Sequence, residues 1–205
     1  MTLLSPPPVR PGEDQGGGLF VGTEKHFKPK TRGPTMSTAL AAFTLFHVVI
    51  SLVAIAAGFV VAYGFLTSQR HDRWHTLFLI MTIATSVTGF LFPFHRFSPA
   101  IGVGILSLMI LAVAVFARYA KKMAGPWRWI YVVTAMIAFY FNFFVLIVQS
   151  FQKIPALHDL APTQTEPPFK IAQAAALIVF AAVTITAAIK FRVEPQLPTA
   201  EALPT

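Results

Sequence analysis

Cysteine is absent from the sequence, so the chain can form no disulfide, no thiolate metal site and no cysteine nucleophile. Charged residues are scarce as well, at 12% of the 205 residues, against about 25% in soluble domains. The serine-hydrolase pattern GxSxG, the P-loop and the dinucleotide-binding glycine pattern are all missing. No pattern in the chain points to catalysis, and we expect a protein that is not an enzyme.

Long apolar runs dominate what is present. Hydrophobic residues make up 55% of the chain, and several runs exceed the ~18 residues that indicate a membrane span. Backbone polar groups inside a bilayer must pair with one another, so runs of this length predict helices. The sequence therefore predicts an all-α, polytopic membrane protein, a bundle of five transmembrane helices at about 38–66, 75–94, 100–120, 128–151 and 170–191.

Residues 1–35 are rich in proline and glycine and contain no periodic apolar pattern. Such a composition cannot bury a core, so we expect a disordered N-terminal leader. Met36 opens the sequence MSTALAAF directly before the first span, and we expect it to be the translation start. Residues 36–192 then form the membrane domain, and residues 193–205 form a flexible tail.

The first predicted span carries small and weakly polar residues on one face. At about 100° per residue, these side chains fall within an arc of roughly 80°. They are Thr44, His47, Ser51, Ala54, Gly58 and Ala62. A face of small residues lets another helix approach closely in a membrane. We therefore expect it to face the inside of the bundle, with no charged side chain between the helices. The polar side chains expected in the interior are His47, Ser51, Thr82, Thr85, Asn142 and Gln149.

His47 is the only ionisable side chain expected well inside a span. Histidine commonly ligates haem between facing helices, which makes His47 a candidate ligand of a b-type haem. No second histidine is expected at a matching depth, however, and we expect no cofactor. His47 could instead relay protons or line a path for a small neutral solute. All eight acidic residues lie outside the predicted spans, which disfavours ion-coupled transport.

The sequence HDRWH places His71 and His75 four residues apart at the end of a span, with Asp72 beside them. At helical spacing the two histidines could share one metal ion. A solvated turn followed by the start of a helix explains the same residues without a metal. We therefore expect no metal site, and His71 and His75 are the only candidates for one.

The formal net charge of +8 comes from basic residues, most of which flank the predicted spans. Such residues contact lipid headgroups, which explains the charge better than nucleic-acid binding does. One side of the membrane carries Arg70, Arg73, Arg118, Lys121, Lys122, Arg128, Lys190 and Arg192, and the other carries Arg96, Lys153 and Lys170. If the chain starts at Met36, this bias places the C-terminus in the cytoplasm. A translated leader adds five basic residues to the poorer side and cancels the bias.

The longest predicted loop, QKIPALHDLAPTQTEPPF at 152–169, contains four prolines, which prevent a continuous helix there. With the C-terminus in the cytoplasm, this loop faces outward. We expect it to be the recognition surface for another membrane or periplasmic protein, although a simple linker between two spans explains the same residues.

From Met36 to about Arg192 the chain resembles a group of small, uncharacterised bacterial inner-membrane proteins with no assigned activity. The segments that carry the resemblance are FHVVISLVAIAAG (46–58), TSVTGFLFPFHRF (85–97), GPWRWIYVV (125–133) and the loop 152–169. The resemblance implies the class of protein and its membrane, and it brings no catalytic residue. We expect an accessory or interaction protein. The alternative is a small haem-binding, solute-conducting or proton-conducting protein centred on His47.

Overall fold

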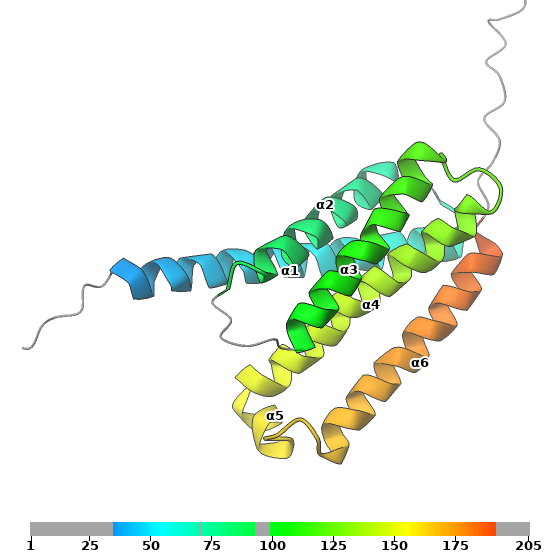
Figure 1. The fold of residues 1–205 in the computed structure, drawn as a ribbon. Helices are drawn as coiled ribbons and strands as arrows, with labels where there is room; N and C mark the ends of the chain where they lie inside the picture. Colours follow the sequence, from blue (N-terminus) through cyan, green and yellow to red (C-terminus); the bar gives the residue numbers. More distant parts are fainter. Residues whose placement is uncertain (1–34, 70, 93–98, 192–205) are drawn as a thin grey trace, which may run out of the picture. The chain divides into compact units, whose positions relative to one another are not determined.

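The computed structural model describes residues 35–69, 71–92 and 99–191, and these ranges contain helices and no strand. The predicted leader, apart from Thr35, and the predicted tail lie outside these ranges, as does His95. The described helices, shown in Figure 1, are α1 (Thr35–Thr67), α2 (Asp72–Gly89), α3 (Pro99–Val115), the π-helical turn η1 (Phe116–Ala120), α4 (Trp127–Lys153), α5 (Pro155–Leu160) and α6 (Pro167–Lys190).

Four segments of the described chain are long and apolar enough to cross a membrane. They are Thr38–Thr67 in α1, Ile101–Ala120 in α3 and η1, Trp127–Lys153 in α4, and Pro167–Lys190 in α6. The chain is therefore a helical, multi-pass membrane protein. The break between the third and fourth predicted spans lies at Gly125 and Pro126, where Gly125 adopts a φ of +52° and Pro126 caps α4.

The second predicted span is the one that differs. Its helix, α2, has 18 residues and begins at Asp72 rather than at His75. It is not among the helices apolar enough to span a membrane by composition. Asp72, Arg73 and His75 occupy its first turn, and threonines and serine recur along the rest. The described chain therefore contains four helices that qualify as spans, one fewer than predicted, and α2 is a fifth, more polar helix.

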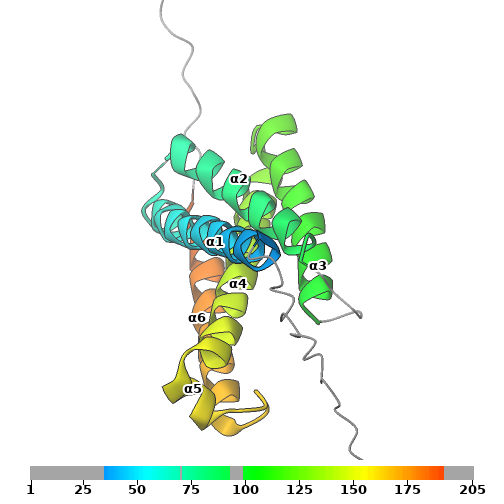
Figure 2. The ribbon, with the colours of Figure 1, turned by 90° about the vertical axis from the view of Figure 1, so that its left-hand side faces the viewer.

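Each long helix packs against the long helix that follows it in the chain. α1 and α2 lie side by side in Figures 1 and 2, and α4 lies between α3 and α6. The short helix α5 joins the end of α4 to the start of α6. Short connections place consecutive helices antiparallel to each other. The C-terminal ends of α1, η1 and α6 therefore lie at the same end of the bundle as the N-terminal ends of α2 and α4. The hydrogen bond from Ser68 Oγ to the Lys190 carbonyl and the ring contact between Phe65 and Phe191 mark this shared end.

The small residues of α1 make room for an aromatic ring of α4. Ala54, Gly58 and Ala62 are buried, as the stripe predicts, but Thr44 is exposed and its hydroxyl donates to the Leu40 carbonyl of its own helix. The Phe139 ring lies against Gly58, so close that a Cβ there would be 2.5 Å from Phe139 Cδ2. A glycine at position 58 therefore sets the approach of α1 to α4.

Gly58→Ala is expected to lower the free energy of unfolding by about 1–3 kcal/mol, because the added methyl overpacks the contact with Phe139. The ring has little room to move, since Phe59 and Phe180 contact it at centroid distances of 5.0 and 4.9 Å. Thermal unfolding in detergent measures the effect. Ala56→Val, at an exposed position of the same helix, is the control and should leave the transition unchanged. Equal transitions for Gly58→Ala and the wild type would contradict the packing described.

Candidate functional site

A buried arginine stands at the end of the third span. The Arg118 side chain is 7% exposed, and its Nη2 donates to Asp72 Oδ1 over 2.7 Å. The guanidinium also lies over the Tyr119 and Tyr131 rings, at 5.6 and 5.5 Å from their centroids. The expectation that no charge lies between the helices is therefore wrong at this end of the bundle. The carboxylate partner is 62% exposed, so the pair joins a buried cation to an anion at the surface.

The π-helical turn brings Arg118 inward. In η1 the Lys121 amide donates to the Phe116 carbonyl, five residues back, over 3.0 Å. The wider turn changes the rotation of the residues it contains, and both Ala117 and Arg118 are buried in it. Turns of this kind often occur at functional sites. The regular period of an α-helix does not predict such a turn. From the sequence alone, Arg118 is therefore predicted among the basic residues that flank the spans, outside the bundle interior.

A buried histidine and tyrosine extend this arrangement into the bundle. His75 Nδ1 and Tyr131 Oη are 2.9 Å apart, and the two residues are 1% and 0% exposed. The Phe65 ring packs against both, at centroid distances of 5.1 and 5.8 Å. Asp72, His75, Arg118 and Tyr131 therefore connect α2, η1 and α4, and we call these four residues the basic-end cluster.

The two candidate metal ligands are directed to different partners. His75 faces Tyr131 inside the bundle, whereas His71 Nε2 lies 3.2 Å from Gln69 Oε1 at the surface. Within the part of the chain that the structure describes, no three histidine, cysteine or carboxylate side chains come together as metal ligands do.

Other polar side chains of α2 bond to each of its neighbours. Asn142 Nδ2 of α4 donates to Thr82 Oγ1 over 3.2 Å, and Ser86 Oγ donates to Ser107 Oγ of α3 over 3.2 Å. His47 of α1 forms a hydrogen bond with Thr88 of α2. Bonds of this kind contribute about 0.6 kcal/mol each in membrane helices. Since they leave α2 in three directions, they hold it against α1, α3 and α4.

Three further residues expected in the interior differ from this pattern. Ser51 is partly buried and donates to the His47 carbonyl within α1. The Thr85 hydroxyl is buried with no hydrogen-bond partner among the described residues. Gln149 is exposed, so it does not belong to the interior set. α4 turns this side chain away from its neighbours near the end of the helix.

His47 is half-buried, and its hydrogen bond defines its tautomer. Thr88 Oγ1 lies 2.7 Å from the Ala84 carbonyl, to which it donates. It therefore accepts from His47 Nδ1 over 2.8 Å, which leaves His47 Nε2 as an acceptor. His75 lies about 20 Å away along α2 by the helical rise. These two histidines therefore cannot ligate one haem.

The opposite end of the bundle carries the segment 154–166, which we call the loop segment. Its helix α5 has no buried residue, and Ile154 and Leu160 are 48% and 57% exposed. Ala161, directly after α5, is fully buried and anchors the segment. Gln164 adopts a φ of 60°, uncommon outside glycine, and its Nε2 donates to the Val148 carbonyl of α4 over 3.1 Å. The segment therefore has a defined shape while its apolar side chains face outward.

A carboxylate holds the last turn of the loop segment. Glu166 Oε1 accepts from the Thr163 hydroxyl over 2.7 Å and from the Thr163 amide over 3.2 Å, and Oε2 accepts from the Thr165 amide over 3.0 Å. The Thr163 hydroxyl, together with these amides, lowers the pKa of Glu166 below its ordinary value of 4.5. The ionised form of Glu166 is thus the form that orders the turn.

The comparisons with known proteins add no relative: no family model, no curated protein and no solved structure matches the chain.

Asp72→Ala is expected to lower the free energy of unfolding by about 1–3 kcal/mol, because it leaves the Arg118 guanidinium without its carboxylate. Arg118→Met removes the buried charge itself and should cost less, since Asp72 is mostly hydrated. Thermal unfolding of both variants and of the double variant measures the coupling. A larger loss for Arg118→Met than for Asp72→Ala would contradict the account of this ion pair.

Acidification is expected to loosen the loop segment before the bundle. A carboxylate whose pKa is lowered by folding adds stability above its unfolded pKa, and that stability is lost as the pH falls through the folded pKa. The Thr163 and Thr165 amides should therefore exchange faster as the pH falls below about 4.5, after correction for intrinsic rates. Hydrogen exchange measured from pH 6 to pH 3 follows this change. In Glu166→Gln these two amides should exchange fast over the whole pH range. If their protection still depended on pH in that variant, the Glu166 carboxylate would not be the group responsible.

Proposed function

We propose that the chain is a non-enzymatic accessory protein of the bacterial cytoplasmic membrane, which presents the loop segment to a partner protein. The observation that carries the proposal is the shape of this segment. Ile154 and Leu160 are exposed apolar side chains on a backbone held by Ala161, Gln164 and Glu166. A segment that is ordered before binding loses less conformational entropy when a partner binds it.

The charge distribution supports an outward-facing loop segment. The end of the bundle that contains the basic-end cluster carries Arg73, Arg118, Lys121, Lys122, Arg128 and Lys190 among the described residues. The loop end carries Lys153 and Lys170. Since loops rich in lysine and arginine stay in the cytoplasm, we place the basic end and the C-terminus there, with Met36 as the translation start. The resemblance to bacterial inner-membrane proteins supports the cytoplasmic membrane as the location.

The partner that fits is a membrane or periplasmic protein with an apolar pocket for Leu160 and Ile154. Asp159 and His158 lie on the same exposed helix and offer polar contacts at its rim. An apolar anchor surrounded by polar contacts is the usual composition of a small protein interface.

Photocrosslinking in cells tests this function. A photoreactive residue at position 160 is expected to give one discrete protein adduct, because the partner covers Leu160. The same residue at position 178 is the control, since Ile178 is 68% exposed in the middle of the apolar helix α6 and should crosslink to lipid. The adduct at position 160 should be lost in Glu166→Ala, in which the turn is released, while membrane insertion stays intact. Lipid adducts alone at both positions would overturn the proposal.

A further inference from the structure

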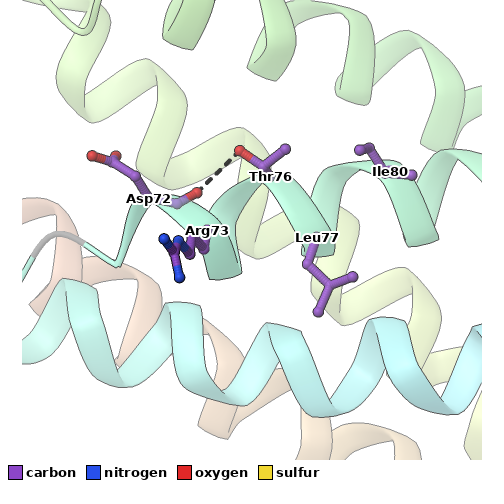
Figure 3. A pocket seen from close by; sticks show the side chains of 5 residues that line it. All are labelled: Asp72, Arg73, Thr76, Leu77 and Ile80. Carbon is purple, nitrogen blue, oxygen red and sulfur yellow. Dashed lines mark hydrogen bonds between the residues drawn. The ribbon is translucent and has the colours of Figure 1, made fainter.

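A shallow, open hollow of about 440 Å³ lies on the outer face of α2, and it is lined by Asp72, Arg73, Thr76, Leu77 and Ile80. Figure 3 shows these side chains in two rows, with Asp72, Thr76 and Ile80 along one side of the helix and Arg73 and Leu77 along the other, toward α1. The lining changes from charged through hydroxyl to apolar within about 12 Å along the helix. A ligand that fits must therefore carry charge at one end and an apolar chain at the other.

The charged, hydroxyl and apolar residues that line the hollow lie at successively greater depths in the membrane. Asp72 and Arg73 lie at the basic end, where the apolar segment of α1 ends at Thr67 and that of α3 and η1 ends at Ala120. Trp74 and Tyr119 are 43% and 51% exposed beside them, as aromatic side chains are at headgroup level. Leu77 and Ile80 lie one to two turns deeper, at the level of acyl chains. The charged end of the hollow thus faces headgroups and the apolar end faces lipid tails.

Charges of both signs distinguish this hollow from the rest of the basic end. The Asp72 carboxylate is fixed in place by Arg118 and still 62% exposed, and the Arg73 side chain beside it is exposed as well. A phosphate matches the Arg73 guanidinium, which can donate two hydrogen bonds to it. A primary ammonium matches the carboxylate, to which it donates with full charge. A headgroup that carries only a negative charge brings no positively charged donor to Asp72.

We propose that this hollow binds a phospholipid whose headgroup carries both a phosphate and a primary ammonium group. The phosphate contacts Arg73, the ammonium contacts Asp72, and one acyl chain covers Leu77 and Ile80. A quaternary ammonium group has no N–H donor, so the site selects against it. Selection therefore depends on the presence of both Asp72 and Arg73 in the hollow, and not on the net positive charge of this end.

Native mass spectrometry of the protein released from nanodiscs tests the proposal. The nanodiscs contain equal parts of phosphatidylethanolamine, phosphatidylglycerol and phosphatidylcholine. The wild-type protein is expected to retain phosphatidylethanolamine about tenfold over either of the others, the size of one charged hydrogen bond. This comparison needs no variant and so does not depend on how a substitution folds. Equal retention of the three lipids, or a preference for phosphatidylglycerol, overturns the proposal.

Variants then locate the site. Arg73→Gln is expected to reduce retention of phosphatidylethanolamine about tenfold, because the phosphate loses its charged partner. Ile80→Trp fills the apolar end of the hollow, keeps both charges, and should reduce retention as well. Lys190→Gln removes an exposed positive charge from the same end of the bundle and serves as the matched control. A loss of retention in Lys190→Gln equal to that in Arg73→Gln would show charge attraction without a site, and would overturn the proposal.

Discussion

A polar group inside a bilayer has to find its partner within the protein, because no water is present to replace one. The helix α2 shows what this constraint does to the bundle. Its inward polar side chains bond to α4 through Tyr131 and Asn142, to α3 through Ser107, and to α1 through His47. Together with Asp72 and Arg73 in the first turn, these side chains make α2 too polar to qualify as a span by composition. The same groups tie it to three neighbours, so its polarity is a source of specific packing.

The two ends of the bundle meet this constraint differently. At the basic end a buried guanidinium is paired with an exposed carboxylate and lies over two tyrosine rings. At the loop end the polar groups satisfy one another within a short segment, through Glu166 and Gln164, and the apolar side chains remain outside. The basic end therefore buries a positive charge inside the bundle, and the loop end exposes apolar side chains on an ordered backbone.

This difference suggests a division of roles between the ends. The lipid site proposed at α2 and the protein-binding surface proposed at the loop segment use separate residues, and neither proposal depends on the other. His47 stands apart from both, held by Thr88 through one ring nitrogen. That bond joins α1 to α2.

The sequence by itself determined the helices, the break at Gly125 and Pro126, and the small face of α1 at Ala54, Gly58 and Ala62, because hydropathy and helical period are local properties of the chain. Tertiary structure alone decided which polar groups meet. Arg118 and Asp72 are 46 residues apart, and the wide turn of η1 rotates Arg118 inward against the regular period. The rotation and register of whole helices likewise expose Gln149 and Thr44. Those quantities depend on how side chains from different helices pack, which no single segment encodes.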